Sequence, residues 1–296
     1  MQIETLKIFC DLVETESFSQ AAEMNFVTQS AVSQQVRGLE EKFKRRLLER
    51  VRGRRDISLT DAGKSFYEES RNVLAAYEIL HERMRSLDET VSGVVRVGTV
   101  YSIGLHELPP VVRRFMELYP SAKIDLEYSR TTRIVRDVLS GSIELGIVAY
   151  PEKRRGLQIV ALPGDRLMLI CSPSHPLAAR KKVRAAELSG YDFVHFERDI
   201  PTRRATDRIF KAHNVTVNRV AEFDNIETIK RAVEVGFGLA IVPRPSVLDE
   251  QRSGQLAVIT LVEPEWTRTV GIIHRSDRAL GIAARKFIEL LESSDK

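Results

Sequence analysis

Residues 18–43 read FSQAAEMNFVTQSAVSQQVRGLEEKF, and this stretch predicts two helices joined by a short turn. Its apolar residues recur at helical spacing on both sides of a break at residues 25–27. Ser17 and Thr28 are good N-caps for the two helices. The inward-facing residues are expected to be Phe18, Ala21 and Ala22 in the first helix, and Ala31, Val32, Val36, Leu39 and Phe43 in the second.

The opposite face of the second helix carries small hydroxyl and amide side chains. Its residues are Thr28, Gln29, Ser30, Ser33, Gln34 and Arg37. Such side chains can approach base edges, whereas Lys and Glu are usual on a solvated helix. Gln29 and Gln34 can hydrogen-bond adenine, and Arg37 can reach phosphate or guanine. The pattern favours a DNA-reading helix-turn-helix, with an ordinary solvated face as the alternative.

A basic cluster follows this helix and shifts the balance towards DNA. The residues between positions 42 and 55 include Lys42, Lys44, Arg45, Arg46, Arg50, Arg52, Arg54 and Arg55 against one acid, Glu49. Leu47–Leu48 and Ile57–Leu59 flank VRGRRD and predict a hairpin with Gly53 at its tip. A basic hairpin beside a recognition helix is a wing suited to phosphates or the minor groove, although a charge run is often only a solvated surface. The residues expected to contact DNA are Ser19, Thr28, Gln29, Ser30, Ser33, Gln34, Arg37, Arg50, Arg52, Arg54 and Arg55.

A long helix is expected next, because Thr60 is a good N-cap and Asp61 suits a helix start. Its apolar residues are spaced by seven, four, three, four and three positions: Phe66, Val73, Tyr77, Leu80, Met84 and Leu87. This is the a/d pattern of a coiled coil, so the helix is expected to dimerise. An amphipathic helix packed on the core of its own domain is the alternative.

After Ser92–Gly93 the pattern changes to alternating strands and helices. Strands are expected at 94–100, 123–130, 144–150, 167–173, 192–197, 219–223, 238–243 and 269–275, and helices at 109–120, 133–141, 185–188, 202–214, 227–236 and 279–294. This order implies a mostly parallel sheet with helices on its faces. The fold class is therefore α/β, either as one unit of about 200 residues or as two similar lobes.

Composition is that of an ordinary folded protein, with 43% hydrophobic and 29% charged residues and a net charge of +4. Cys10 and Cys171 lie in apolar runs and are expected to be buried free thiols in a reducing compartment. The N-terminus lacks the features of a secretion signal, and no uncharged apolar run approaches ~18 residues. We therefore expect a cytoplasmic protein that does not enter a membrane.

The sequence motifs that could indicate catalysis or metal binding lack the surrounding residues that such sites need. Residues 236–238 read GFG but follow a helix, the reverse of the order in a dinucleotide site. The six histidines show no metal-ligand spacing, and no nucleophile elbow surrounds residues 172–175. His106 and His195 are read as capping or pocket groups. No enzyme, cofactor or metal is expected.

Taken together, SFSQAAE at 17–23, TQSAVSQQVRGLEE at 28–41, LLER at 47–50 and SLTDAG at 58–63 resemble the LysR-type transcriptional regulators. The resemblance implies a winged helix-turn-helix (1–59), a linker helix (60–91) and a two-lobed effector domain (92–296) similar to a type 2 periplasmic binding protein. Lobe I would span about 92–161 and 266–296, and lobe II about 162–265. The family implies a homotetramer built as a dimer of dimers. Expected partners are double-stranded DNA, a small effector, a second copy of the chain and, as a further candidate, RNA polymerase.

The resemblance also implies an effector site between the lobes. The positions that match it are Thr99, Val100, Tyr101, Ser102, Ser129, Arg130, Thr131, Pro201, Thr202, Arg203 and Asn225. Arg130, Arg133, Arg203 and Arg204 lie in or near these segments, so we expect an anionic effector, with solvated or ion-paired arginines as the alternative. Tyr101 is bulky and indicates a small ligand. A solute-binding or enzymatic α/β protein with an N-terminal interaction domain is the rival class.

Overall fold

The computed structural model describes residues 1–50, 57–85 and 91–293. The chain divides into two units: the first is formed by residues 1–89 and 140–142, and the second by residues 90–139 and 143–296. Arg52, Arg54, Arg55, Gly53 and Leu87 lie outside the described residues.

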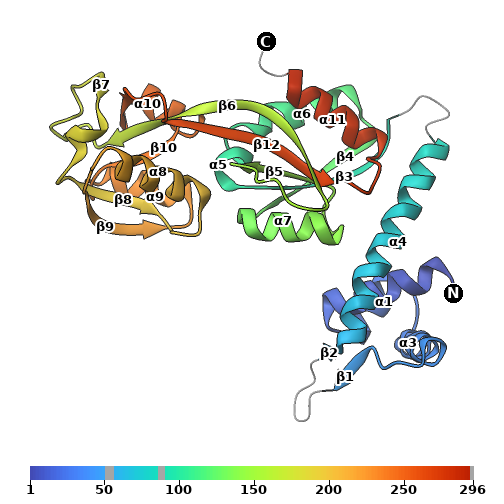
Figure 1. The fold of residues 1–296 in the computed structure, drawn as a ribbon. Coiled ribbons are helices and arrows are strands. Elements are labelled where there is room, and N and C mark those ends of the chain that lie inside the picture. Colours follow the sequence, from blue (N-terminus) through green and yellow to red (C-terminus); the bar gives the residue numbers. More distant parts are fainter. Residues whose placement is uncertain (51–56, 86–90, 294–296) are drawn as a thin grey trace. The chain divides into compact units, whose positions relative to one another are not determined.

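The first unit contains three helices, a two-stranded sheet and a long helix (Figure 1). They are α1 (Ile3–Thr15), α2 (Phe18–Met24), α3 (Gln29–Phe43), β1 (Leu48–Arg50), β2 (Ile57–Leu59) and α4 (Asp61–Arg85). β1 and β2 pair antiparallel, as the hairpin prediction requires. The core of this unit is formed by Ile8, Phe9, Leu12, Ala21, Ala22, Val32, Val36, Leu39 and Leu47. Phe43 is the exception to the predicted inward set: it is 44% exposed, although its ring lies 5.2 Å from that of Phe66.

The three predicted helix caps are confirmed. The Ser17 hydroxyl accepts from Gln20 N, and that of Thr28 from Ala31 N. Thr60 Oγ1 accepts from Gly63 N at 2.9 Å, while Thr60 N donates to the carbonyl oxygen of Leu47. This close approach requires glycine, because a Cβ at position 63 would lie 1.9 Å from that oxygen.

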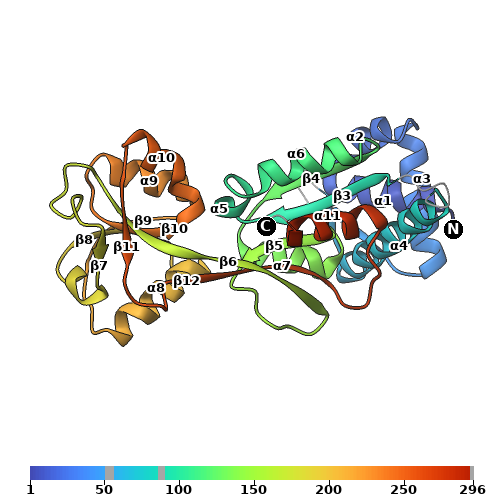
Figure 2. The ribbon, with the colours of Figure 1, turned by 90° about the horizontal axis from the view of Figure 1, so that it is seen from above.

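The second unit is built around an eight-stranded sheet with the order β4-β3-β5-β12-β6-β11-β7, in which β10 also pairs with β6 (Figure 2). The strands of this unit are β3 (Gly93–Thr99), β4 (Ala122–Tyr128), β5 (Leu145–Ala149), β6 (Leu157–Cys171), β7 (Lys182–Val183), β8 (Asp192–Phe196), β9 (Asn218–Phe223), β10 (Ala240–Pro243), β11 (Ala257–Leu261) and β12 (Thr267–Arg275). Of these, β8 and β9 form a separate, parallel two-stranded sheet. Its helices are α5 (Tyr101–Gly104), α6 (Leu108–Leu118), α7 (Thr131–Ser140), η2 (Ala185–Leu188), α8 (Pro201–Ala212), α9 (Ile226–Glu234), η3 (Arg244–Val247), α10 (Leu248–Ser253) and α11 (Ile282–Ser293).

Two long strands join the two lobes of this unit. The first part of β6 pairs with β12 beside β3, β4 and β5, and its second part pairs with β10 and β11. We call the β3–β5 side lobe I and the β7–β11 side lobe II; Figure 2 shows β6 and β12 running between them. The expectation of a mostly parallel sheet is wrong here, because β12 is antiparallel to β5 and β6, and β10 and β11 are antiparallel to β6.

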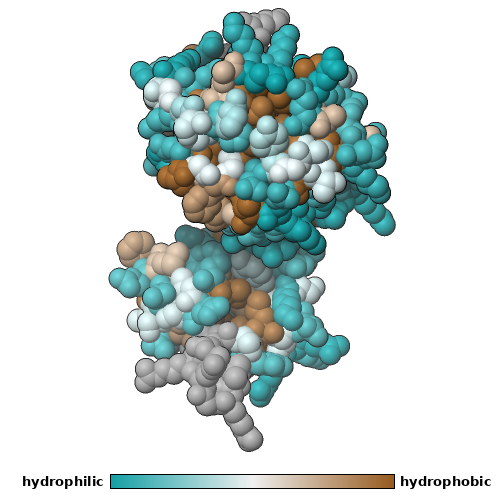
Figure 3. Space-filling view, turned by 90° about the vertical axis from the view of Figure 1, so that its left-hand side faces the viewer, coloured by the Kyte–Doolittle hydropathy of each residue, from teal (hydrophilic) through white to brown (hydrophobic). Residues whose placement is uncertain are grey.

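Helices cover both faces of the sheet in each lobe. In lobe I, α6 and α11 meet through Phe115 and Phe287, whose rings lie 5.3 Å apart, and α7 packs on the other face. In lobe II, α8 and Trp266 cover one face, and α9 covers the other. On the face that Figure 3 shows, hydrophobic surface lies among hydrophilic surface. The exposed apolar side chains of lobe II include Val235 and Phe237.

Both cysteines are buried free thiols, as expected. Cys10 belongs to α1 in the first unit, and Cys171 ends β6 in lobe II. Burial raises the pKa of Cys10 to about 12 and that of Cys171 to about 11. Within the described ranges, no helix is long and apolar enough to cross a membrane.

Candidate functional sites

The polar face of α3 is exposed along its length. Thr28, Gln29, Ser30, Ser33, Gln34 and Arg37 are all exposed, as is Ser19 in α2. The opposite side holds Val32, Val36 and Leu39, each at most 5% exposed. The helix therefore presents short polar side chains outward on a buried apolar stripe, which is the geometry that groove readout needs.

Hydrogen bonds order the start of this face. Thr28 Oγ1 lies 2.9 Å from Ser30 Oγ and also caps the helix, and Ser19 Oγ lies 3.3 Å from Gln29 Oε1. Ser19, on α2, thus supports Gln29, on α3, across the turn. Four of the DNA-contact candidates are therefore hydrogen-bonded to one another in two pairs.

Glu40 connects α3 to the hairpin, a role that the sequence reading did not identify. Its Oε1 accepts from Leu47 N at 2.8 Å and from Leu48 N at 3.3 Å. These amides lie just before and at the start of β1, the first strand of the predicted wing. Arg50 ends that strand, and Arg52, Arg54 and Arg55 lie outside the described residues.

The predicted coiled-coil residues of α4 divide into two groups. Phe66 packs within the first unit, with its ring 5.1 Å from that of Phe9. Val73, Tyr77 and Leu80 are instead 46%, 41% and 55% exposed. The start of α4 at Phe66 thus packs on the core of its own domain, whereas Val73, Tyr77 and Leu80 form an exposed apolar stripe at heptad spacing.

A pocket lies between the two lobes of the second unit, at the ends of β3, β4 and β8. Its volume is about 50 Å³, enough for a few water molecules or a small ligand group. The lining residues are Val100, Tyr101, Ser102, Ser129, Arg130, Thr131, Thr132, Ala149, Phe196, Asp199, Ile200, Pro201, Thr202, Asp224 and Ile226. Tyr101 stacks on Tyr128 with ring centroids 5.7 Å apart, which fixes its bulk at the pocket wall.

Arg130 links the lobes at the edge of this pocket. Its guanidinium lies 2.8 Å from Glu197, 2.9 Å from Asp199 and 3.1 Å from Asp224, all in lobe II. Hydrogen bonds to Asp224 and Asp199 raise the pKa of Arg130 further above its already high value. Its charge is therefore engaged by three carboxylates in this arrangement.

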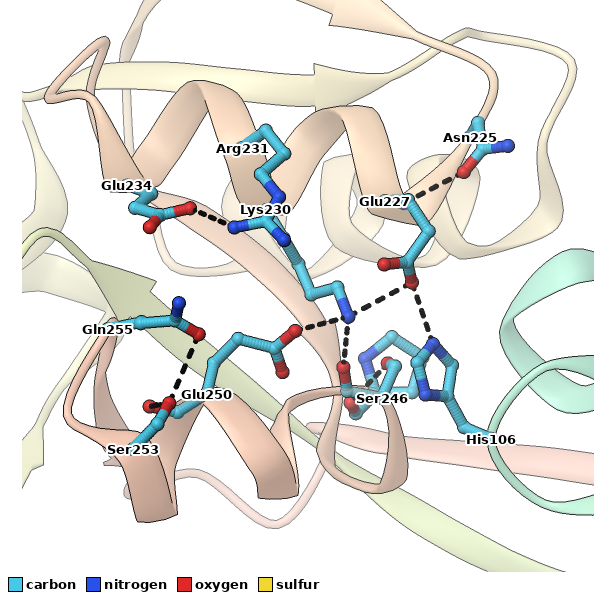
Figure 4. Close-up of polar contacts among 11 residues, drawn as sticks. His106, Asn225, Glu227, Lys230, Arg231, Glu234, Ser246, Glu250, Ser253 and Gln255 are labelled. Carbon is cyan, nitrogen blue, oxygen red and sulfur yellow. Dashed lines mark hydrogen bonds and ion pairs between the residues drawn. The ribbon is translucent and has the colours of Figure 1, made fainter.

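A second polar contact between the lobes lies at the start of α9, between Glu227 and His106 (Figure 4). Glu227, in the first turn of α9, lies 2.8 Å from His106 of lobe I and 2.9 Å from the buried Lys230. Lys230 also contacts Glu250 at 2.7 Å and the carbonyl oxygen of Ser246. Burial alone would raise the pKa of Glu227, but hydrogen bonds from Lys230 and His106 hold it below its ordinary value.

Three of the expected effector residues do not line the pocket. Thr99 is fully buried. Asn225 caps α9 by accepting from Glu227 N at 2.8 Å. Arg203 is 6% exposed and is bound to Asp207, Glu222 and the carbonyl oxygen of Phe196. Its hydrogen bond holds the pKa of Glu222 at about 2. Arg203 therefore does not line this pocket, and its place in the effector site stays a prediction.

Arg133 and Arg204, the other two arginines expected near the effector, do not line the pocket either. Arg133 lies 3.1 Å from Glu127 and 3.3 Å from Asp137, and Arg204 is exposed on α8. Among the residues that the structure describes, no cluster of His, Cys, Asp and Glu is arranged to hold a metal ion.

Ser102 has a buried partner that the sequence reading missed. Arg268, on β12, is fully buried and donates to Ser102 Oγ at 2.9 Å. The same guanidinium contacts Glu107 at 2.7 Å and Asp165 on β6. Burial raises the pKa of Asp165, although the charge of Arg268 opposes the shift.

Comparison with known proteins places both sites in one family. Residues 3–64 match the profile of the bacterial regulatory helix-turn-helix proteins of the LysR family, and residues 88–295 match the LysR substrate binding domain. A probable RuBisCO transcriptional regulator of Thalassiosira pseudonana is 30% identical, over 93% of this chain and 92% of its own length.

Solved structures agree on the fold. A full-length OxyR variant from Pseudomonas aeruginosa is 22% identical with a TM-score of 0.79, covering 99% of this chain and 94% of that one. Full-length CbnR in complex with its target DNA is 22% identical with a TM-score of 0.72, covering 99% and 100%.

The chain belongs to the LysR family. It is a DNA-binding transcriptional regulator, not an enzyme, and its C-terminal domain binds a small-molecule effector. The resemblance noted in the sequence is thereby confirmed, as are the winged helix-turn-helix and the two-lobed α/β domain.

Proposed function

We propose that the exposed face of α3 reads base edges in the major groove while the basic hairpin binds the flanking backbone. The observation that carries this proposal is the exposure pattern of α3: six candidate contact residues face outward, and the apolar stripe behind them is buried. Gln29 and Gln34 offer paired donor and acceptor groups that match adenine. Arg37 and the hairpin arginines offer the charge that makes binding depend on salt.

The test is selection of binding sites from a random duplex pool with the full-length protein. Gln34→Ala should relax base preference at one position, a change worth ~1–3 kcal/mol. Arg37→Ala should weaken binding and reduce the salt slope by roughly 0.9 if it contacts one phosphate. Lys123→Ala is the matched control, because it removes one exposed positive charge in the second unit. Unchanged affinity and consensus for both α3 variants would exclude this face as the reader.

The chain is proposed to dimerise through α4 and to assemble further into a dimer of dimers. Val73, Tyr77 and Leu80 support the first step, because they are exposed at heptad spacing. A dimer would present two α3 helices to successive major grooves, which fits the symmetry of such operators. Since its target is chromosomal duplex DNA, the cytoplasm is the proposed site of action, and RNA polymerase is a candidate partner there.

The effector is proposed to be a small anion bound between the lobes. Three helices of nine residues or more begin at the pocket, with Thr131, Pro201 and Ile226 as their first residues. Helix N-termini attract negative charge, and Arg130 stands among them. An anionic group would compete with Glu197, Asp199 and Asp224 for Arg130 and would thereby change how the lobes are held together. Such a change would alter DNA bending by the bound assembly.

Arg130 and Arg133 form a matched pair for testing this site. Arg130 lines the pocket, whereas Arg133, three residues on, contacts Glu127 and Asp137. A thermal-shift screen of small metabolites should find carboxylates or phosphates that stabilise the wild type and Arg133→Gln but not Arg130→Gln. Equal stabilisation of the two variants would remove Arg130 from the site.

A further inference from the structure

A broad groove on lobe II shares no lining residue with the pocket between the lobes. Its volume is about 960 Å³, and its walls are α8, the second half of β8, the start of β9 and the loop that joins α8 to β9 (Figure 1). The α8 residues that line it follow the spacing of one helical face: Arg203, Asp207, Phe210 and Lys211. The groove is therefore a site of its own.

Two side chains in this groove are buried but keep unused hydrogen-bonding groups. His195 and Arg203 are each 6% exposed. The His195 ring packs against Phe193 and Phe210, and neither of its nitrogens is hydrogen-bonded to any residue of the described ranges. Arg203 donates through Nε and Nη1, whereas its Nη2 has no partner in the part of the chain that the structure describes. Because buried polar groups nearly always have a partner, these groups point to a molecule in the groove.

The charges around the groove favour a ligand with one negative charge. Asp207 contacts Arg203 Nε at 2.7 and 2.9 Å. Glu222 lies 2.8 Å from Arg203 and 2.9 Å from Arg219. Lys211 is exposed at the rim and forms no ion pair with a described residue. Three cations and two carboxylates leave one positive charge, so a single anionic group balances the site, and a second one would meet Asp207 uncompensated.

The other lining residues indicate what carries this charge. Phe210, Val215 and Val217 form an apolar wall that an alkyl chain can cover and a mineral anion cannot. Burial lowers the pKa of His195 to about 4, so its ring is neutral near pH 7 and can donate one N–H to an oxygen without adding charge. An organic acid therefore matches the groove better than phosphate does.

We propose that this groove is a second ligand site that takes a small organic acid, with the carboxylate at Arg203 Nη2 and Lys211 and the carbon chain against Phe210. The inference does not depend on the effector site proposed above, because the two sites have no lining residue in common. It gives Arg203 a ligand-binding role outside the pocket between the lobes.

The test compares butyrate with butylamine, which has the same carbon chain and the opposite charge. Each is titrated into the full-length protein, and binding is followed by saturation-transfer NMR. We expect saturable binding of butyrate and none of butylamine. Inorganic phosphate at the same concentration should not displace butyrate, because it cannot cover the apolar wall.

Three variants locate the acid within the molecule. Arg130→Gln removes the cation of the pocket between the lobes and should leave binding in the groove intact. In that background, Lys211→Gln should weaken butyrate binding about fivefold, because a charge-assisted hydrogen bond becomes a neutral one. Lys181→Gln is the matched control, since Lys181 is an exposed cation of lobe II outside the groove and should change nothing.

Two further measurements examine the floor of the groove. Arg203→Lys keeps the charge but lacks the second guanidinium nitrogen, so butyrate affinity should fall about tenfold. In the Arg130→Gln protein, saturating butyrate should slow amide hydrogen exchange at 214–219 and leave 129–132 unchanged. The Lys211 and Lys181 pair decides the matter even if Arg203→Lys does not fold.

The inference fails if butyrate does not bind saturably, if butylamine binds as tightly, or if phosphate displaces butyrate at equal concentration. It fails too if Lys211→Gln and Lys181→Gln bind butyrate equally, or if exchange at 214–219 does not slow. Loss of all binding in Arg130→Gln would assign the acid to the pocket between the lobes and remove it from the groove.

Discussion

Replacing Glu40 should loosen the predicted wing without disturbing the recognition helix itself. The carboxylate accepts from the amides of Leu47 and Leu48 at 2.8 and 3.3 Å. Hydrogen bonds to a charged group contribute about 1.5–3 kcal/mol each, and the second of these is long. We expect Glu40→Ala to cost about 2 kcal/mol locally. Glu40→Gln keeps an acceptor oxygen and should cost about 1 kcal/mol.

Amide hydrogen exchange measures this effect at the two donors. A loss of about 2 kcal/mol corresponds to roughly 30-fold faster exchange at Leu47 and Leu48 in Glu40→Ala, and about 1 kcal/mol to roughly fivefold in Glu40→Gln. DNA affinity should fall in the same order. Glu41→Ala is the control, because Glu41 is the exposed neighbour and its loss removes the same charge. Unchanged protection at both amides in Glu40→Ala would refute the connection between α3 and the wing.

Three further outcomes are expected. Burial lowers the pKa of His195 from 6.5 to about 4. Because the unfolded chain then binds this proton more tightly than the folded chain, protonation favours unfolding. The contribution of His195 to the free energy of unfolding should be fully present above pH 6.5 and should fall by up to about 3 kcal/mol as the pH drops to 4. In His195→Phe, the loss of stability between pH 6.5 and 4 should be smaller, as measured by unfolding followed through the fluorescence of the single tryptophan, Trp266. An unchanged pH dependence would contradict the assignment. Tyr77→Glu with Leu80→Glu should lower the molar mass seen by light scattering, and an unaltered mass would exclude α4 as the dimer contact. Gly63→Ala should destabilise the first unit by about 1–3 kcal/mol in thermal unfolding, because its Cβ would lie 1.9 Å from a carbonyl oxygen; a wild-type midpoint would contradict this.

The first unit could be predicted well from sequence because its elements depend on local signals. The caps at Ser17, Thr28 and Thr60 and the stripe of α3 are set by residues three or four positions apart. Periodicity alone therefore sufficed to place the exposed face. Glu40 was missed because its partners lie beyond a turn, where helical spacing gives no information.

The second unit was predictable in its order of elements but less so in its contacts. The sequence predicted a strand only at 167–173, whereas β6 runs from Leu157 to Cys171 because its two parts find different partners. Arg203 follows two pocket residues, but a step of one residue along α8 turns its side chain towards Asp207 and Glu222. Arg268 and Asp165 are 103 positions apart, so only the folded chain brings them together.

The two buried thiols make the native protein its own probe of local opening. Each lies in a different unit, and each must become exposed and lose its proton before an alkylating reagent can react. Labelling followed by peptide mass spectrometry would thus time the opening of the DNA-binding part at Cys10 and of the effector part at Cys171 in a single sample. No introduced dye or tag would be required. A duplex or metabolite that stabilises only one unit would slow labelling of the cysteine in that unit and leave labelling of the other cysteine unchanged.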